Sequence, residues 1–366
     1  MRVLALTKYG RKAASTRQRF VQYEDALKSA GISVHYAPLL DDAHIERLAR
    51  GERSSTPYLA LRYLRRLLTV LTSARYDILW VHCELFPYLP GLLEKTALLV
   101  RRPILFDYDD AIFHMYDVSG NPAVRWALGN KLAPLLRAAS ACGCGNAYLQ
   151  RYAMRYCSNS VILPTVVDTS RYLPGAASEE GRPLTIGWIG TPSTWPYVRP
   201  ILPMLRNLVD GRSVRFRVVG AGTAAESDRF DGVDLVDWSE ESEIREVQAM
   251  DIGIMPLPDE PWARGKSGYK LIQYMACGLP VVASPVGVNS DIVLEGVSGF
   301  LAERPDQWTA ALSKLLDSRE LRAAMGAAGR SRAQASYSLA ATAPRLTELM
   351  LSVAAGRGSS GSGSDT

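Results

Sequence analysis

Residues 251–291 contain two short apolar runs that flank a polar segment and a helical pattern. The runs at 251–257 and 281–284 are rich in Ile and Val and bounded by Pro or Gly, which is typical of buried parallel strands. Between them, apolar residues recur every four positions over 271–279, and Gly and Pro close the pattern. The order strand, loop, helix, strand predicts an α/β unit with parallel strands.

Basic side chains follow the first of these strands, at the end where α/β units bind ligands. Arg264 and Lys266 lie in the loop, and Lys270 and Gln273 can share one face of the helix that comes next. A helix start offers N–H groups and the positive end of the helix dipole, which favour an anion. Three cations at this point indicate a phosphate or diphosphate site. The alternative is a solvated helix start with ordinary surface charges.

The same alternation of strand and helix runs along the whole chain. Short apolar runs lie at 1–6, 32–37, 76–82, 103–106, 139–144 and 160–164, and again at 184–190, 214–220 and 233–236. The segment 174–183, rich in Gly, Ala, Ser and Glu, is typical of a linker between the two groups. We therefore expect two α/β domains, each with a parallel sheet covered by helices. Apolar residues at 20, 23, 27 and 30 predict a helix that ends at Gly31, and the Ala-rich segment 308–336 is also expected to be helical.

The segment 41–75 is basic and has a helical pattern. Leucines at 61, 64, 67, 68 and 71 form a stripe, with arginines at 62, 65 and 66 outside it. One interpretation is a surface helix that docks its leucines on a sheet and turns its charges to solvent. The other is an interfacial membrane helix with arginine on its polar side. The first interpretation is favoured.

The bulk properties exclude several classes of protein. The net charge of +5 is mild for 366 residues, so it suits an anionic ligand or an anionic membrane surface but gives no argument for nucleic acid. No window of about 20 residues is free of charge, and the first apolar run is too short for a signal peptide. The five cysteines lack zinc or redox spacing and are expected to be reduced thiols. We expect a cytoplasmic protein, with peripheral contact at the inner face of the membrane as one option.

At 274–287 the sequence Tyr-Met-Ala-Cys-Gly-Leu-Pro-Val-Val-Ala-Ser, followed by Val-Gly, resembles the donor-site block of retaining glycosyltransferases of the GT-B fold, in glycosyltransferase family 4. Residues 165–172 are similar to the interdomain segment of that family, and 186–192 falls where its second domain opens. The resemblance implies two Rossmann-like domains that face each other across a cleft. It implies an acceptor domain over 1–173, a nucleotide-sugar domain over 183–336, and a helix at 337–355 that packs back on the first domain. The Gly/Ser-rich tail at 356–366 is expected to be disordered.

The resemblance also implies the reaction. The family moves a sugar from a nucleotide sugar, here a UDP- or GDP-sugar, to a saccharide, lipid-linked or small-molecule acceptor, with retention and with no metal or other cofactor. Its two usual glutamates correspond here to Gly265 and Gln273, a departure that is similar to polysaccharide-biosynthesis branches. The amide of Gln273 can still bond a ribose hydroxyl. The Arg and Lys that usually follow the first strand of the second domain are replaced by residues 191–195. The loop and helix cations are therefore expected to neutralise the phosphates.

These arguments give a set of candidate site residues. Lys266 and Arg264 would stabilise the leaving diphosphate, and His82 is a candidate base, although the leaving phosphate itself can take the acceptor proton. The predicted donor-binding residues are Gly190, Thr191, Lys266, Gly268, Tyr269, Lys270, Gln273, Trp238, Gly287 and Asp291. The predicted acceptor-side residues are Arg17, His82, Glu84, Asp109 and Asp110. Arg17 and Arg19, near the first loop, could also approach the phosphates from across the cleft. Asp291 as a helix cap, Arg17 and Arg19 as surface charges, and His82 as a structural residue or a sugar hydroxyl contact remain alternatives.

Three other functions stay open. Asp107-Tyr108-Asp109 is a D-x-D pattern of hard oxygen ligands, which would suit a manganese-dependent transferase. The missing glutamates are also compatible with a non-catalytic nucleotide-sugar-binding or scaffold protein. A nucleotide-sugar epimerase or NAD enzyme is disfavoured because the first strand is not followed by G-x-G-x-x-G.

Overall fold

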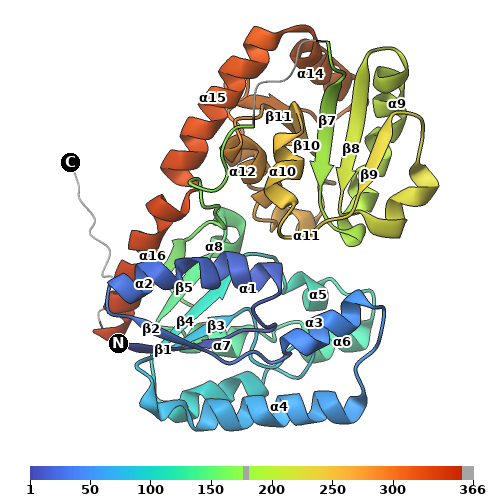
Figure 1. The fold of residues 1–366 in the computed structure, drawn as a ribbon. Helices are drawn as coiled ribbons and strands as arrows, with labels where there is room; N and C mark the ends of the chain where they lie inside the picture. The colour runs from blue at the N-terminus through green and yellow to red at the C-terminus, as the bar shows by residue number, and fades with distance from the viewer. Residues whose placement is uncertain (176–180, 357–366) are drawn as a thin grey trace. The chain divides into compact units, whose positions relative to one another are not determined.

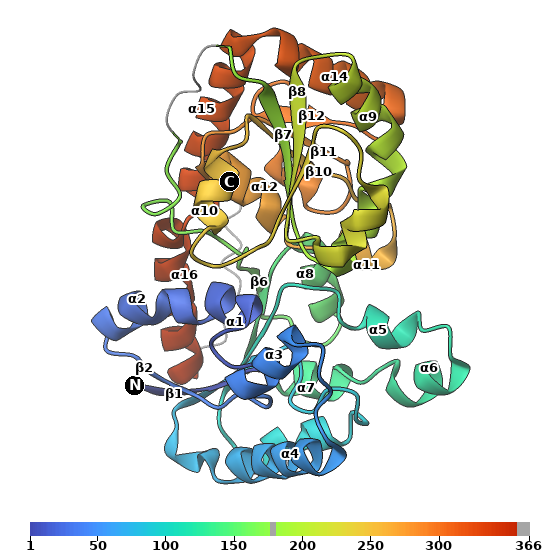
Figure 2. The same cartoon turned by 45° about the vertical axis from the view of Figure 1, so that its right-hand side comes forward.

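The computed structural model describes residues 1–175 and 181–356. It divides into two compact units. Unit 1 comprises Met1–Thr165, Gly265–Ser267 and Thr342–Thr366, and unit 2 comprises Val166–Arg264 and Gly268–Ala341. Part of the predicted linker, 176–180, and the predicted disordered tail from residue 357 lie outside the described residues. Each unit is a parallel sheet with helices on both faces (Figures 1 and 2).

The sheet of unit 1 has six parallel strands in the order β2-β1-β3-β4-β5-β6. The strands are β1 (Arg2–Leu6), β2 (Ser33–Tyr36), β3 (Ile78–His82), β4 (Ile104–Tyr108), β5 (Ala141–Cys144) and β6 (Ser160–Ile162). Every residue of the central strands β3 and β4 is buried, as their unbroken apolar runs predict. The carboxyl ends of β3 and β4 therefore lie side by side, with His82 level with Asp107 in the pairing register.

The helices of unit 1 are shorter than the sequence patterns predict. The expected helix before Gly31 is interrupted at Phe20, whose backbone leaves the helical region, giving α1 (Ala14–Arg19), the 3-10 turn η1 (Val21–Tyr23) and α2 (Glu24–Ser29). The expected helix over 41–75 is two, α3 (Asp42–Ala49) and α4 (Thr56–Leu71). Gly51, at φ +74°, follows the end of α3, and Ser55 with Pro57 begins α4. The remaining elements are η2 (Ser73–Arg75), η3 (Leu93–Val100), α5 (His114–Asp117), α6 (Pro122–Leu128), α7 (Ala133–Ala138) and α8 (Ala147–Ala153).

The orientation of α4 corrects the favoured interpretation of its leucine stripe. Arg66 is buried and donates to the carbonyl oxygen of Thr7, whereas Leu64 and Leu68 are exposed. Arg62 also points inward, because its guanidinium donates to the carbonyl oxygens of residues 38 and 39. The interpretation that α4 docks its leucines on the sheet and exposes its arginines is therefore wrong.

The sheet of unit 2 also has six parallel strands, in the order β12-β11-β10-β7-β8-β9. They are β7 (Leu184–Ile189), β8 (Val214–Val219), β9 (Val233–Val236), β10 (Ile252–Met255), β11 (Val281–Ala283) and β12 (Gly299–Leu301). β12 was not predicted, because its three residues, which begin with Gly, are too few to form a strand pattern. The centre of the sheet is the pair β7 and β10, whose neighbours on the two sides are β8 and β11.

Two apolar cores cover the two faces of this sheet. One is built around Trp188, Phe216 and Trp308, with α9 (Leu202–Asp210) and α14 (Pro305–Asp317). The other contains Leu271 and Met275 of α12 (Tyr269–Ala276), with α10 (Glu243–Gln248) and α15 (Arg319–Ser336). The expected helix over 308–336 is thus two, separated at Ser318, which caps α15. The remaining elements are η4 (Pro192–Tyr197), η5 (Arg199–Ile201), η6 (Gly222–Asp228), α11 (Pro261–Arg264) and α13 (Asn289–Ile292).

The last helix is α16 (Leu339–Ala354), and from Thr342 onward it belongs to unit 1. Its Arg345 guanidinium donates to the carbonyl oxygen of Ile162 at 2.7 Å, so it binds the end of β6. The five cysteines are free thiols, four of them buried, as predicted. Among the described residues, no helix has the length and apolar character needed to cross a membrane.

Candidate functional site

Two neighbouring strands of unit 2, β7 and β8, are each followed by a glycine at one edge of the sheet. Gly190 follows β7, and a Cβ atom built on it would lie 2.4 Å from the ring of Trp188 and 2.9 Å from Cε of Lys270. Gly220 follows β8, and a Cβ there would lie 2.4 Å from the oxygen of Gly190 and 3.0 Å from Cβ of Trp238. Glycine at both positions therefore lets Trp238 and Lys270 approach the end of β7 from either side.

The start of α12 lies at the same edge and has a cation, Lys270, in its first turn. Gly268 is the N-cap at φ +68°, so it has no side chain to occupy the first N–H groups of the helix. Lys270 is half-buried, and its Nζ is 5.5 Å from the ring centroid of Trp188. The helix start and the Lys270 ammonium together present positive charge at the carboxyl ends of β7 and β10. This arrangement favours an anion such as a phosphate.

The loop after β11 supports the start of α12. A Cβ on Gly268 would lie 2.3 Å from Cδ1 of Ile292 and 3.7 Å from Oδ1 of Asn289, both in α13. Gly287, at φ +56°, packs against the backbone of Arg264, whose oxygen would lie 2.6 Å from an added Cβ. Oδ1 of Asn289 is buried and has no hydrogen-bond partner among the described residues. Asn289 therefore adds to the predicted site an acceptor that a ligand hydroxyl or N–H can satisfy.

Gln273 lies deeper in α12 than its predicted role requires. It is 2% exposed, and its Nε2 donates to Oε1 of Glu243 at 2.9 Å and to the hydroxyl of Tyr172 at 3.1 Å. Tyr172 also donates its hydroxyl to Glu243, and Nε1 of Trp238 donates to the other carboxylate oxygen at 2.7 Å. Glu243, which was not predicted, is therefore the acidic centre of a network that joins the buried Gln273 and Tyr172 to the exposed Trp238. In the sequence, only its position five residues after Trp238 points to Glu243.

The two loop cations differ in their surroundings. Arg264 ends α11 and forms a bidentate ion pair with Asp259, at 2.6 and 3.0 Å, on an exposed surface. This pairing lowers the pKa of Asp259, and it occupies much of the donor capacity that a phosphate would need. Lys266 is half-buried and lies in Gly265–Ser267, the segment that groups with unit 1. Tyr269 is half-buried in the first turn of α12.

Two further donor-site predictions lie near the same edge. Thr191 begins η4 as its N-cap, with reciprocal bonds to Thr194, and is exposed. Asp291 is exposed within α13, and Arg332 donates to its backbone oxygen. The N-cap of α13 is Val288, so the alternative that Asp291 caps this helix is wrong.

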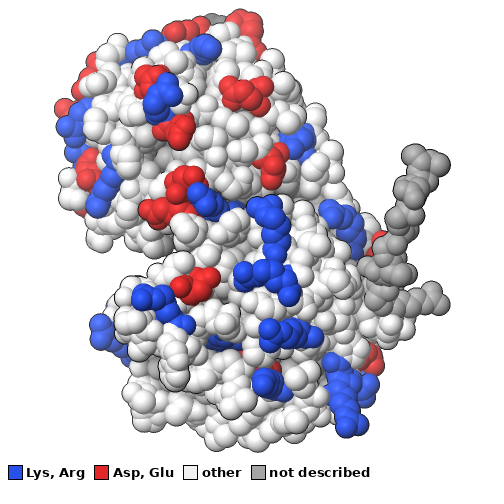
Figure 3. Space-filling view, turned by 180° about the vertical axis from the view of Figure 1, so that it is seen from behind, with Lys and Arg blue, Asp and Glu red and all other residues white. Residues whose placement is uncertain are grey.

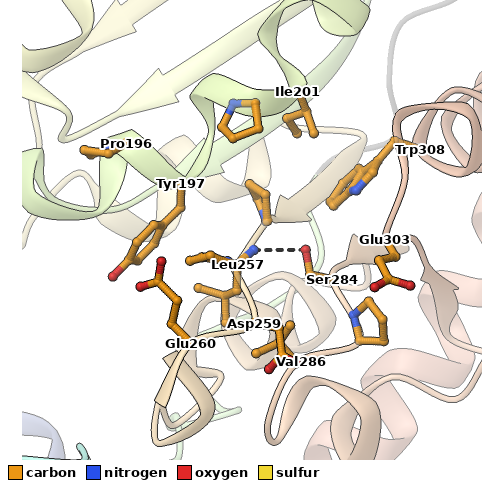
Figure 4. A pocket seen from close by; sticks show the side chains of 14 residues that line it. Pro196, Tyr197, Ile201, Leu257, Asp259, Glu260, Ser284, Val286, Glu303 and Trp308 are labelled. Atoms are coloured by element: carbon orange, nitrogen blue, oxygen red, sulfur yellow. Dashed lines mark hydrogen bonds between the residues drawn. The ribbon is translucent and has the colours of Figure 1, made fainter. Parts of the chain in front are cut away.

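A cavity of about 540 Å³ opens at the carboxyl ends of β10 and β11 (Figure 4). Its walls include Tyr197, Leu257 and Trp308, and Asp259, Glu260 and Glu303 supply acidic groups. In Figure 4 the backbone N–H of Leu257 donates to Oγ of Ser284, which joins the two loops at the floor. Lys270, Trp238, Gly190 and Gly220 are not among the residues that line this cavity. The cavity is therefore distinct from the anion-binding start of α12.

In unit 1, the ends of β3 and β4 bring His82 and Asp109 together. His82 is buried, and its ring nitrogens have no hydrogen-bond partner among the described residues. Nε2 lies 3.9 Å from Oδ1 of Asp109, which is too long for a hydrogen bond but leaves room for a shared ligand atom. Thr165 donates its hydroxyl to Asp109 at 2.9 Å. Burial alone would raise the pKa of Asp109, but the His82 imidazole and the Arg19 guanidinium outweigh it and lower that pKa to about 2.

Two predicted polar residues of unit 1 belong to its buried framework. Glu84 accepts from the hydroxyl of Tyr116 at 2.8 Å and lies 3.4 Å from Nζ of Lys131. Burial raises the pKa of Glu84, because desolvation disfavours the carboxylate more than Lys131 stabilises it. Asp110 is half-buried, and its backbone oxygen accepts from the amide of Ile112.

The two arginines near the first loop have different environments. Arg19 is buried and donates to both carboxylate oxygens of Asp107, each at 2.9 Å. Both oxygens of Asp107 are thus occupied inside the fold, and neither alternative offered for Arg19, a phosphate contact or a surface charge, is correct. Arg17 is half-buried in α1 and donates to the carbonyl oxygen of Lys12. The described residues contain no group of three or more His, Cys, Asp or Glu side chains suited to hold a metal ion.

Comparisons with known proteins agree with this architecture. Residues 185–318 match the family model described as Glycosyl transferases group 1. The D-inositol 3-phosphate glycosyltransferase of Thermobispora bispora is 36% identical over 118 residues, which cover 32% of this chain and 24% of the relative. That of Streptosporangium roseum is 32% identical over 118 residues, with the same coverage of 32% and 24%. The matched part of this chain thus spans about a quarter of the length of these relatives.

Solved structures match nearly the whole chain. Sucrose-phosphate synthase from Thermosynechococcus elongatus has a TM-score of 0.69 at 16% identity and covers 97% of this chain and 99% of its own. Anabaena HepE in complex with UDP and glucose has a TM-score of 0.70 at 15% identity, covering 96% and 100%. A glycosyltransferase from Rickettsia africae has a TM-score of 0.69 at 12% identity, covering 96% and 98%.

Two parallel six-stranded α/β sheets that match these structures define the GT-B fold, so the predicted fold class is confirmed. Residues 185–318 are similar to the group 1 glycosyltransferases, and this match and the GT-B fold agree with the sequence resemblance to glycosyltransferase family 4.

Proposed function

We propose that the protein is a retaining glycosyltransferase that moves a sugar from a nucleotide-diphosphate sugar to a saccharide, lipid-linked or small-molecule acceptor without a metal ion. The observation that carries the proposal is the start of α12, where Gly268 leaves the helix N–H groups uncapped and Lys270 lies beside Gly190. This anion site lies within the segment that matches the group 1 family model. A diphosphate is the ligand that its charge and geometry suit best.

Stabilisation of the leaving diphosphate is the catalytic task assigned to this site. As the bond to the sugar breaks, negative charge grows on the phosphate oxygen, and fixed donors that already point at it lower the barrier. In our proposal Lys270 and the first N–H groups of α12 supply that stabilisation, with Lys266 adding a second cation from the preceding loop. Arg264 contributes only if its ion pair with Asp259 opens, so we give it a smaller effect.

The domain roles follow from the same assignment. Residues 183–336 would bind the donor, with Trp238 beside the nucleoside, and residues 1–173 would bind the acceptor. The imidazole of His82, which accepts or donates no hydrogen bond among the described residues, and the nearby carboxylate of Asp109 are suited to bond an acceptor or sugar hydroxyl. Independence from manganese is supported by Asp107, because Arg19 occupies both of its oxygens and leaves no D-x-D pair for a metal.

The nucleotide base and the sugar of the donor are proposed from the similar proteins. HepE from Anabaena was solved in complex with UDP and glucose, so UDP-glucose is the first donor to test. The D-inositol 3-phosphate glycosyltransferases give an acceptor class to include, a phosphorylated polyol, beside saccharides and lipid-linked saccharides. GDP-sugars serve as the comparison that tests selection of the base.

The test is to incubate the protein with UDP- and GDP-sugars and these acceptors, with EDTA, and to measure donor hydrolysis and transfer. We expect Lys270→Ala and Lys266→Ala each to lower turnover or weaken donor binding by about tenfold or more, as for a lost charge-assisted contact of about 1.5–3 kcal/mol. Lys314→Ala, which removes an ammonium that lies over the ring of Phe300, is the matched control and should be unchanged. Donor binding without turnover would favour the scaffold alternative, and strict manganese dependence would refute the metal-free mechanism.

A further inference from the structure

The outward face of α4 is apolar. Leu61, Leu64, Leu68 and Leu71 are 46%, 53%, 52% and 43% exposed. Spacings of three, four and three residues align them along one side of the helix, where they form a continuous leucine stripe. A soluble protein rarely exposes such a stripe on a helix whose other side already contacts its own sheet, so the stripe marks an interaction surface.

The inward face of α4 explains why the leucines point outward. Arg62 and Arg66 donate to backbone oxygens of the strand-end loops beneath the helix, at residues 38, 39 and 7. Arg66 is 3% exposed, and Val70 on the same side is fully buried. The polar contacts that hold α4 in place are therefore made to loops of the same unit. A rotation of α4 that buried the leucines would expose Val70 and break these bonds.

A neighbouring element extends the stripe. η3 packs beside α4, and its Leu98 and Leu99 are 48% and 71% exposed. In Figure 1, α4 is the outermost helix on its side of the sheet of unit 1. The stripe and these two leucines form one apolar surface, which we call the α4 surface.

The charges around the α4 surface have one sign. Arg65, Lys95, Arg101 and Arg102 are exposed on α4 and at η3 and its end. From residue 53 to residue 76 the chain has no Asp or Glu, and Glu94 is buried in an ion pair with Lys131. Figure 3 shows basic side chains gathered on unit 1 with few acidic ones among them. The α4 surface thus combines exposed apolar groups with a basic rim.

We infer that the α4 surface docks on an anionic phospholipid membrane. The leucines would enter the boundary between head groups and acyl chains, and the basic rim would contact lipid phosphates. A second copy of the chain fits less well, because a two-fold contact through this surface would bring the basic rims of both copies together. The inference concerns only unit 1 and does not depend on glycosyl transfer.

Cosedimentation with vesicles tests the inference. The full chain should bind phosphatidylcholine vesicles that contain phosphatidylglycerol, bind plain phosphatidylcholine far less, and release as salt rises. Leu64→Glu/Leu68→Glu should weaken binding by at least about tenfold, and Arg101→Gln/Arg102→Gln should weaken it mainly at low salt. Leu351→Glu is the matched control, since Leu351 is a 47% exposed leucine of α16, and it should bind like the wild type.

Two further measurements keep the test decisive. Circular dichroism checks that each variant is folded. If the Leu64→Glu/Leu68→Glu variant is not folded, Leu64→Gln/Leu68→Gln is used in its place. Sedimentation velocity without vesicles detects self-association. The inference is overturned if the wild type does not bind anionic vesicles, or if Leu351→Glu loses as much binding as Leu64→Glu/Leu68→Glu. It is also overturned if the wild type forms a dimer and Leu64→Glu/Leu68→Glu is a monomer.

Discussion

Replacing Asp107 by Asn should destabilise unit 1 strongly. The carboxylate is 1% exposed and accepts two bonds of 2.9 Å from the Arg19 guanidinium, which is itself 3% exposed. Burial works against the charge on Arg19, and Asp107 together with Asp109 compensates for it, so the pKa of Arg19 is raised overall. The amide of Asn keeps the shape but removes the charge. Breaking a buried pair on one side typically costs about 3–5 kcal/mol, because an uncompensated ion stays in the core.

Hydrogen exchange of the β4 amides in native buffer measures this loss for unit 1 alone, since the slowest amides report its unfolding free energy. Arg11→Gln is the matched control. The Arg11–Glu24 pair is also bidentate, but its side chains are 51% and 33% exposed, so the loss should stay below about 1 kcal/mol. Replacing both buried partners by apolar residues, Arg19→Met/Asp107→Leu, should recover much of the stability.

Equal losses for Asp107→Asn and Arg11→Gln would refute the buried-pair argument. The same variants examine the D-x-D alternative. If Asp107 were a manganese ligand, Mn²⁺ would raise the unfolding temperature of the wild type, and Asp107→Asn would abolish the increase. We expect no manganese-dependent increase in either protein.

Three further predictions concern the two sites. Gly268→Ala should lower the free energy of unfolding by about 1–2 kcal/mol, because alanine is strained at φ +68°, and by more because its Cβ meets Ile292. It should also reduce the thermal shift produced by UDP. Gln273→Glu restores the family's residue but places a second carboxylate beside Glu243, whose Oε1 now accepts from Nε2 of Gln273 at 2.9 Å. Urea unfolding at pH 7 should show that the free energy of unfolding falls by about 1–3 kcal/mol, and this loss should diminish at pH 5, where one carboxylate is protonated more easily. The pKa of Asp109, about 2, lies below its ordinary 3.8, so its ionised form stabilises the fold above about pH 4 and this contribution disappears as the pH falls toward 2. The stability difference between wild type and Asp109→Asn in urea unfolding should shrink by about 2 kcal/mol over that window.

The sheets could be predicted because their strands are unbroken apolar runs. β3, β10 and β11 lie within predicted runs, since buried parallel strands need apolar side chains on both faces, and β4 extends two residues beyond its run at 103–106. The helix breaks at Phe20 and Ser318 were missed because backbone geometry and a cap, rather than Gly or Pro within the pattern, interrupt these helices.

The side-chain partners were harder to predict. The leucine period along α4 gives its spacing but not which side faces the sheet, and the bonds of Arg62 and Arg66 decide that. The glycine loops and Lys270 were found from local sequence, because strand ends and helix starts are local features. Glu243 was missed because its partners Tyr172 and Gln273 are distant in sequence. For the same reason, the pairing of Arg19 with Asp107, 88 positions away, could not be predicted.

Transfer from a radiolabelled UDP-sugar in the presence of EDTA, compared between wild type, Lys270→Ala and Lys314→Ala, tests the central proposal most directly. We predict turnover by the wild type and the Lys314 variant, and a loss of about tenfold or more for Lys270→Ala. Equal turnover by all three proteins would contradict the assignment of the α12 start as the diphosphate site. No turnover and no thermal shift with any UDP- or GDP-sugar would contradict the proposed glycosyl transfer itself.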